Sequence, residues 1–311
     1  MLGIFNKKSN KLKTKNIIIE FLSYPLIALI YVISWLPLPA LYPISKLIFF
    51  LIYYFPGYRK NVVYKNLENS FPEKSQGELL SIRRRFYHHL SCVCVEITKL
   101  LNISQTELKR RCSFTPEAKE LINSYLANNR SVLIVLAHYG NWEWGGASFF
   151  PTFGKKPVTS YKPLKNRVVD RFMKHLRSRF GIEAYPKDSI VRKMVAMRNE
   201  VSATALIADQ TPSPANAHWV KFLNQDTPVF KGTARLSIML NYPLIYCSPR
   251  VKKRGHYEVH AWLITSKPKE YDEYTISSLH SQILEKEIKR APEYWLWSHK
   301  RWKHKKPAQT E

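Results

Sequence analysis

A histidine and a glutamate follow a run of apolar residues in the segment VLIVLAHYGNWEWGG, residues 132–146. His138 ends this run, Gly140 permits a tight turn, and Asn141 is a favourable N-cap for a helix that would hold Glu143 in its first turn. A spacing of five does not put two side chains on one helical face, so His138 and Glu143 meet only if the turn folds back. We expect Glu143 to accept a hydrogen bond from one imidazole nitrogen and to leave the other nitrogen as a general base. Because no serine or cysteine is adjacent, that base would deprotonate a hydroxyl group of the substrate.

Other interpretations of this histidine remain open. The metalloprotease motif H-E-x-x-H is absent and no second histidine lies nearby in the sequence, which disfavours a zinc site. A histidine whose ring is satisfied by the local backbone at a strand end is the structural alternative. The four cysteines form no C-x-x-C pair, so neither a metal site nor a disulfide framework is predicted, and we expect reduced thiols at Cys92, Cys94, Cys112 and Cys247.

The elements around His138 follow from periodicity. The β-branched run SVLIVLAH, residues 131–138, is typical of a strand buried on both faces, as in a parallel sheet. A capping box at Ser75 and Glu78 opens a helix that we expect to reach about Leu101. A helix from Thr115 to about Asn129 follows. Further helices are expected at 166–180, 188–199, 231–241 and 273–290, and further strands at 182–185, 201–209, 243–250 and 256–264. The sequence therefore predicts an α/β fold with a mostly parallel sheet flanked by helices.

Two apolar runs near the N-terminus predict a hydrophobic helical membrane anchor. They span residues 17–33 and 41–55, are separated by prolines, and are short for crossing a bilayer. Basic residues flank both sides, and positive flanks stay cytoplasmic, which favours a re-entrant or interfacial hairpin. No small-residue cleavage site follows, so we do not expect a removed signal peptide. The alternative is a buried helical hairpin of a soluble protein.

The charge of the chain favours an anionic partner. Lys and Arg number 49 against 23 Asp and Glu, for a formal net charge of +26. Nucleic acid, an acidic protein and an anionic membrane surface all fit this charge. Basic and aromatic residues interleave, yet no nucleic-acid-binding module is recognisable, so we expect no nucleic acid among the partners.

The segment HYGNWE, residues 138–143, matches the His-x4-Asp/Glu signature of the glycerolipid and lysophospholipid acyltransferase superfamily. More closely, the chain resembles the bacterial lipid A biosynthesis late acyltransferases. The segments that carry this resemblance are NLENSFPE at 66–73, LAHYGNWEW at 136–144, RSRFG at 177–181, IADQ at 207–210, FKGTARLS at 230–237 and PEYWLWSHKRWK at 292–303. The resemblance implies a glycerolipid acyltransferase-like fold, which would divide into an anchor at 1–57, a helical segment at 58–110 and an acyltransferase domain at 111–306.

The resemblance also assigns roles by position. It implies that His138 is the general base and Glu143 its partner. It assigns Arg177 and Arg179 to the grip on a phosphorylated acceptor, for which the arginine fork is suited. A solvated helix face is the alternative for these arginines.

Two further candidates, Asn141 and Asp209, are assigned to substrate binding. Asp209 matches the acidic residue of the family's A-D-Q segment. Gly232, Thr233 and Arg235 fall at the superfamily's third block, where Lys231 replaces the usual acidic residue, so core packing is an equal interpretation there.

The implied reaction is acyl transfer from a thioester to a hydroxyl group, without a covalent acyl-enzyme, metal or cofactor. The donor would be acyl–acyl carrier protein and the acceptor a phosphorylated lipid A precursor, at the cytoplasmic face of the inner membrane. Every one of these partners is negative, which agrees with the charge of the chain. The tryptophans at 295, 297 and 302 could form a second interfacial contact or pack on the core. Another lipid acceptor, a catalytically inactive lipid-binding scaffold and, most remotely, a basic membrane-tethered nucleic-acid-binding protein are the remaining alternatives.

Overall fold

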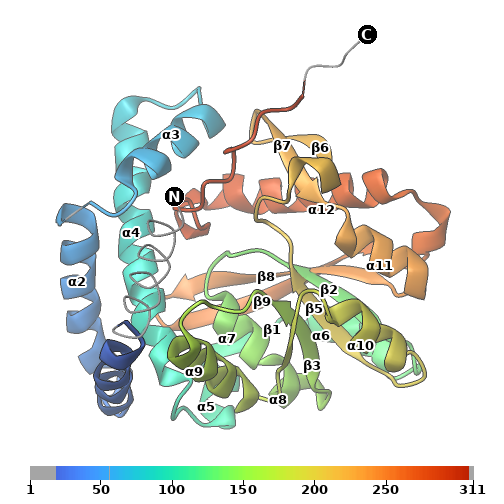
Figure 1. Ribbon diagram of the computed structural model, residues 1–311, viewed down its shortest axis with the longest axis horizontal. Coiled ribbons are helices and arrows are strands. Elements are labelled where there is room, and N and C mark those ends of the chain that lie inside the picture. Colours follow the sequence, from blue (N-terminus) through green and yellow to red (C-terminus); the bar gives the residue numbers. More distant parts are fainter. Residues whose placement is uncertain (1–18, 56, 308–311) are drawn as a thin grey trace, which may run out of the picture.

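A seven-stranded sheet forms the centre of the computed structural model, which describes residues 19–55 and 57–307 (Figure 1). The strand order is β1-β9-β8-β2-β5-β3-β4. The strands are β1 (Cys112–Phe114), β2 (Val132–Leu136), β3 (Pro157–Tyr161), β4 (Glu183–Pro186), β5 (Ala203–Ile207), β8 (Leu244–Lys253) and β9 (His256–Thr265). β8, β2, β5, β3 and β4 are mutually parallel, whereas β9 pairs antiparallel with β8. The predicted mostly parallel sheet and the predicted strand at 256–264 are confirmed; that strand, β9, is antiparallel to β8 and is not at the edge.

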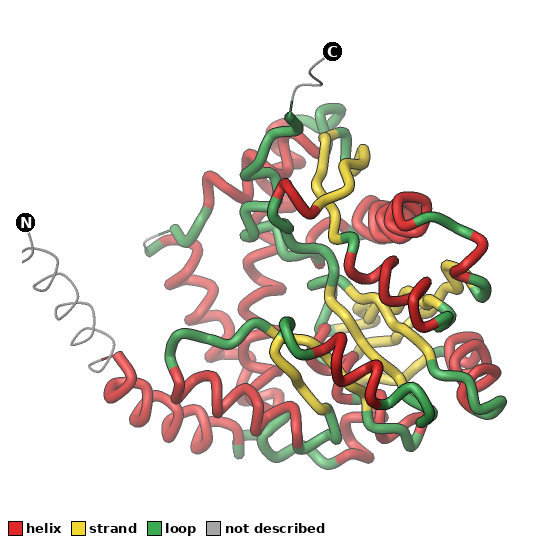
Figure 2. The backbone as a smooth tube through the Cα atoms, turned by 45° about the vertical axis from the view of Figure 1, so that its right-hand side comes forward, coloured by secondary structure: helices red, strands yellow, loops and turns green. Residues whose placement is uncertain are grey.

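Helices cover both faces of this sheet (Figures 1 and 2). They are α2 (Leu38–Tyr54), α3 (Lys60–Ser70), α4 (Gln76–Lys99), α5 (Gln105–Arg111), α6 (Pro116–Leu126), α7 (Trp142–Ala147), α8 (Phe149–Phe153), α9 (Arg167–Ser178), α10 (Ile190–Ala196), α11 (Gly232–Leu240) and α12 (Glu273–Arg290), together with a helix over residues 19–34. The structure also contains a two-stranded antiparallel ribbon that was not predicted from the sequence, formed by β6 (Ala217–Phe222) and β7 (Gln225–Phe230).

Strand β2 explains the two-layered core. All five of its residues are buried, because β8 and β5 flank it and helices cover both of its faces. Leu133 and Val135 point into one apolar cluster, with residues of α3, α4 and α12. Val132 and Ile134 point into the other, with residues of α6 and α9. The alternation of side chains along a strand produces this division.

Helix ends fall where the capping residues predict. Ser75 and Glu78 form the expected capping box at the start of α4. Thr115 Oγ1 accepts from the amide of Ala118 at the start of α6, at 3.1 Å. Such caps satisfy amides that have no partner inside the helix.

The two N-terminal apolar runs form the helix over residues 19–34 and α2. In the described part of the chain, no helix has the length and apolar character needed to cross a membrane. The lysine-rich segment 1–16, and the first two residues of the apolar run at 17–33, lie outside the described residues. Many apolar side chains of both helices are nevertheless exposed, with Phe21 of the first helix at 74% and Leu47 of α2 at 58%.

Candidate active site

A sharp turn after β2 carries His138 at the carboxyl edge of the sheet. Gly140 has a φ of 58°, and a Cβ there would lie 1.9 Å from the carbonyl oxygen of Pro249, so only glycine fits. The amide of Gly140 donates to the carbonyl of Tyr294 at 3.0 Å. The amide of Leu296 donates to the carbonyl of His138, also at 3.0 Å. The C-terminal segment therefore holds the turn through two backbone hydrogen bonds.

Asp209 is the carboxylate that holds the imidazole of His138. The ring Nδ1 lies 2.7 Å from Asp209 Oδ1, and the backbone amide of His138 donates to Oδ2 at 2.9 Å. The indole Nε1 of Trp295 donates to Oδ2 at 2.9 Å. Since Asp209 follows β5 and His138 follows the adjacent β2, parallel pairing brings the two together. A neutral imidazole then carries its proton on Nδ1 and presents Nε2 as the acceptor.

This contact corrects the expectation that Glu143 would orient His138. Glu143 lies in the first turn of α7, which carries its side chain toward α9. There Arg177 donates from Nε to Oε2 at 3.0 Å and from Nη2 to Oε1 at 2.6 Å. His138, the predicted general base, and Glu143, its predicted partner, thus belong to two neighbouring pairs, His138–Asp209 and Glu143–Arg177.

The two pairs influence each other electrostatically. Burial lowers the pKa of His138, but the charge and hydrogen bond of Asp209 and the charge of Glu143 outweigh it, so the pKa lies above its usual value, while Arg177 opposes this rise. Burial raises the pKa of Asp209, but the charge and hydrogen bonds of His138 and the bond from Trp295 outweigh it and lower that pKa to about 2. Asp209 therefore stays ionised at neutral pH and stabilises a proton on the imidazole.

Of the other predicted site residues, some line the cavity, whereas Arg179 and Arg235 are exposed and make their bonds elsewhere. Arg177 lines the cavity, whereas Arg179 donates from Nη1 to the carbonyl of Leu100 at the end of α4. Gly232 and Thr233 line the cavity, and Arg235 instead donates from Nε to Glu273 at 2.9 Å.

Asn141 has a structural position. Its Oδ1 accepts from the amide of Trp144 at 3.1 Å, which confirms the predicted N-cap. Its Nδ2 donates to Oε2 of the fully buried Glu96 at 2.9 Å. The hydroxyl of Tyr257 donates to the same oxygen, and that of Tyr42 donates to Oε1 at 3.3 Å. Burial raises the pKa of Glu96 despite these three bonds. We call these four side chains, Tyr42, Glu96, Asn141 and Tyr257, the Glu96 network.

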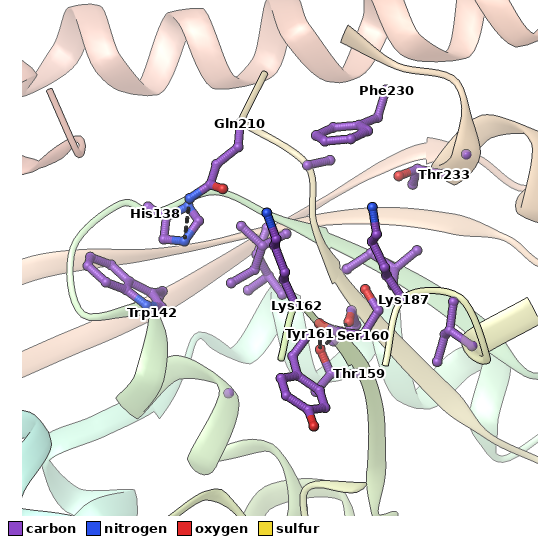
Figure 3. Close-up of a pocket in the computed structure, with 18 of the residues that line it drawn as sticks. His138, Trp142, Thr159, Ser160, Tyr161, Lys162, Lys187, Gln210, Phe230 and Thr233 are labelled. Carbon is purple, nitrogen blue, oxygen red and sulfur yellow. Dashed lines mark hydrogen bonds between the residues drawn. The ribbon is translucent and has the colours of Figure 1, made fainter. Parts of the chain in front are cut away.

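A cavity of about 1000 Å³ opens in front of His138 (Figure 3). Leu136, Ile207 and Leu236 are among its apolar lining residues. The side-chain nitrogen of Gln210 lies 3.5 Å from Nε2 of His138, and the Trp142 ring packs against the imidazole with centroids 5.1 Å apart. In Figure 3 the amines of the lining residues Lys162 and Lys187 extend in the same direction beside the cavity. The cavity thus combines apolar walls, cationic groups and one imidazole.

The C-terminal tryptophans pack on the core rather than forming a second interfacial contact. Trp295 is 2% exposed and Trp297 is fully buried. The indole of Trp302 donates to Thr227 Oγ1 at 2.7 Å. The sequence did not reveal that this segment donates a hydrogen bond to Asp209 and supports the turn at His138.

A metal ion would need several ligating side chains close together. Among residues 19–55 and 57–307, no group of three His, Cys, Asp or Glu side chains is arranged to hold a metal ion. The four cysteines are free thiols.

A parallel α/β sheet with an ionised carboxylate behind a histidine, facing a cavity, defines a site that can take a proton from a bound group. A sequence profile described as bacterial lipid A biosynthesis acyltransferase matches residues 6–304. The chain therefore belongs to that family and is an acyltransferase.

Individual relatives agree with this assignment. The chain is 23% identical over 248 residues to the lipid A biosynthesis palmitoleoyltransferase of Escherichia coli (strain K12), which covers 79% of each chain. The same identity and coverage hold for the lipid A biosynthesis acyltransferase of Shigella flexneri. The match to the lipid A biosynthesis lauroyltransferase of Escherichia coli (strain K12) is 23% over 279 residues, or 89% of this chain and 90% of that protein.

Proposed function

We propose that this acyltransferase moves a fatty acyl chain from an acyl thioester to a hydroxyl group of a lipid A precursor, with His138 as general base. The observation that carries the proposal is the orientation of the imidazole, because Asp209 occupies Nδ1 while Nε2 lies beside Gln210 at the cavity. The family and the relatives support lipid A as the acceptor class.

In the first step, Nε2 of His138 removes the hydroxyl proton as the oxygen attacks the thioester carbonyl carbon. The carbonyl π electrons move to oxygen and give a tetrahedral oxyanion. The carbon–sulfur bond then breaks, and the thiolate leaves with the proton returned by the imidazolium. Ionised Asp209 stabilises that imidazolium between the two transfers, and no acyl-enzyme forms.

We assign the binding of the oxyanion to two side chains. Gln210 presents its amide nitrogen close to Nε2 of His138. Arg177, which lines the cavity, donates from Nε and Nη2 to Glu143, so we assign its Nη1 to the oxyanion. In this mechanism Glu143 fixes the plane of the guanidinium, as a bidentate partner does.

The acceptor and donor are assigned by charge and shape. Lys162, Lys174 and Lys187 line the cavity and suit the phosphate of a phosphorylated lipid acceptor. The net charge of +26 suits an acidic donor such as acyl carrier protein. The apolar lining suits the acyl chain.

The proposal includes association of the protein with the cytoplasmic face of the inner membrane. The helix over residues 19–34, α2 and the residues that flank them expose apolar side chains, including Phe21, Val32, Trp35 and Phe55, in a protein rich in positive charge. Such a surface suits insertion into the headgroup boundary of an anionic bilayer.

A lipid profile by mass spectrometry tests the function. A strain lacking the protein is complemented with wild type, His138→Ala or the control His218→Ala; His218 lies on β6, and its imidazole is near Glu273 at the start of α12. We expect the deleted strain to lose one acyl chain from lipid A, and wild type and His218→Ala to restore it. Full restoration by His138→Ala would refute the mechanism. Loss of an acyl group from another lipid class alone would refute lipid A as acceptor.

A second assay identifies the donor. Purified enzyme receives the same acyl chain on acyl carrier protein or on coenzyme A. We expect faster transfer from the carrier protein, and the advantage should fall as salt is raised, because the proposed attraction is electrostatic. Equal rates that do not respond to salt would contradict this donor.

A further inference from the structure

Helix α9 has two faces with different neighbours. One face carries Val169, Met173 and Arg177 into the cavity. The ring of Phe172, on another face, lies edge-on to Tyr31 with centroids 6.1 Å apart. His175 lies one turn further along, with its ring centroid 6.5 Å from Tyr31. The wall of the cavity that holds Arg177 is therefore packed directly against the helix over residues 19–34.

The start of α9 is bonded to the same helix. Asn166 caps α9, its Oδ1 accepting from the amides of Val168 and Val169, and its Nδ2 donates to Ser23 Oγ at 2.7 Å. The amide of Arg167 donates to Glu20 Oε1 at 3.3 Å. A carboxylate at a helix N-terminus is stabilising. Two side chains of the N-terminal helix thus fix the position of the first turn of α9.

The other ends of both helices meet at the end of α4. Lys99 donates from Nζ to the carbonyls of Ser34 at 2.7 Å and Leu36 at 3.0 Å. Arg179, just after α9, donates to the carbonyl of Leu100. The helix over residues 19–34 is therefore secured along one side against α9 and α4, while its opposite side exposes Phe21, Leu22, Leu29 and Val32.

We propose that the helix over residues 19–34 is a positioning element of the active site, which holds α9, and through it Arg177 on Glu143, by means of Tyr31, Ser23 and Glu20. This inference rests on the proposed function. The same helix offers its apolar side to the lipid surface, so its seating there and the geometry of the Glu143–Arg177 pair are mechanically linked. Tyr31 acts here through α9 and is a positioning residue.

The electrostatics of His138 provide a readout. The charged and titratable groups that face its ring are Asp209 after β5, Glu143 on α7, Arg177 on α9 and His299 in the C-terminal segment. Of these, Arg177 lowers the pKa of His138 and Glu143 raises it. If α9 moves outward, the positive charge leaves and the carboxylate loses its partner. The pKa of His138 then rises, and the loss of activity toward acid begins at a higher pH.

The test compares variants of one helix in the full-length enzyme, assayed in the same detergent micelles. Tyr31→Leu removes the aromatic contact with α9, whereas Tyr31→Phe keeps the ring. Tyr24→Leu makes the same change at a tyrosine that is exposed on this helix. Ser23→Ala, which leaves the Asn166 cap in place, is a second and milder variant. The pH profile of kcat/KM is measured for each, because it reports on the free enzyme.

We expect Tyr31→Leu to move the acid limb upward by about half a pH unit and to lower kcat/KM by about tenfold. Ser23→Ala should move the limb in the same direction, and Tyr31→Phe and Tyr24→Leu should keep it at the wild-type position. A Tyr31→Leu enzyme with a lower rate but an unmoved limb would overturn the inference, since mere loss of folded enzyme lowers the rate equally at all pH values. Retained activity of His138→Ala would instead refute the proposed function.

Discussion

Two buried carboxylates, Asp209 and Glu96, each contact the turn that carries His138, and they differ in what surrounds them. Asp209 accepts hydrogen bonds from the imidazole and backbone amide of His138 and from the indole of Trp295. Glu96 receives two phenol hydroxyls and the amide of Asn141. Burial acts on both, yet the pKa of Asp209 is lowered to about 2 and that of Glu96 is raised.

The difference shows what a titratable partner adds to a buried carboxyl group. Neutral donors leave the desolvation of Glu96 uncompensated, so the network favours the protonated acid and acts as a cross-link between α2, α4, α7 and β9. An imidazole that can take a proton reverses that balance at Asp209. Only the pairing of Asp209 with an imidazole allows a buried carboxylate to stabilise a proton that is taken up and released during a reaction. We therefore place the chemistry at the His138–Asp209 pair.

The largest contrast is expected between Asp209→Asn and Glu96→Gln, which are the same isosteric change. Asp209→Asn should lower kcat/KM by about a thousandfold, because an amide does not hold the imidazole in its reactive tautomer. Glu96→Gln should stay within about fivefold of wild type, because the amide can bond all three neighbours and neutral bonds differ by about 1 kcal/mol or less. Steady-state acyl transfer by purified enzymes measures both.

Thermal unfolding of the two variants is the control for folding. Equal losses of activity in Asp209→Asn and Glu96→Gln, with folding intact, would remove the distinction between a chemical and a structural carboxyl group.

The pair next to the imidazole should give a smaller effect with opposite signs. Arg177→Gln and Glu143→Gln should each lower kcat/KM by about a hundredfold, as expected for a misplaced electrostatic group. Removing Arg177 raises the pKa of His138 and moves the acid limb upward, whereas removing Glu143 lowers that pKa and moves the limb downward. Shifts in the same direction would show that the two side chains do not act on His138 through their charges.

The smallest effect concerns stability against pH. The pKa of Asp209 lies below its usual 3.8, so its contribution is complete above 3.8 and is lost as pH falls toward about 2. That loss amounts to roughly 2 kcal/mol. The pKa of Glu96 lies above its usual 4.5, so its contribution is present below 4.5 and is lost as pH rises through the folded-state pKa.

Urea unfolding in detergent over a range of pH tests these opposite signs. Asp209→Asn should flatten the acidic limb of the stability curve, and Glu96→Gln should gain stability relative to wild type as pH rises above 4.5. The same pH dependence in both variants would contradict the comparison.

Local patterns predicted much of the fold. The apolar run at 131–138 gave β2, Asn141 gave the cap of α7, and Ser75 with Glu78 gave the start of α4. Strand β3 was missed because PVTSY has neither an apolar run nor strict alternation. Periodicity describes single elements well, since it depends on neighbours in the chain.

The partner of His138 could not be read in the same way. β2 pairs with β5, which lies more than 60 residues later, because β3 and β4 lie on the far side of β5 toward one edge of the sheet. Glu143 was chosen for its closeness in sequence, but the helix that begins at Asn141 turns its side chain toward Arg177. A signal for Asp209 did exist: it ends a predicted strand, as His138 does, and such ends gather at one edge of a parallel sheet.

The most direct test of the central claim is nitrogen NMR of the His138 ring in wild type, Asp209→Asn and Glu143→Gln, with His138→Ala to assign the signal. On the alkaline side of the acid limb, the account predicts a proton on Nδ1 in wild type and in Glu143→Gln, and loss of that single tautomer in Asp209→Asn. If Asp209→Asn keeps the Nδ1 proton and Glu143→Gln loses it, Asp209 does not orient the base and the account is wrong.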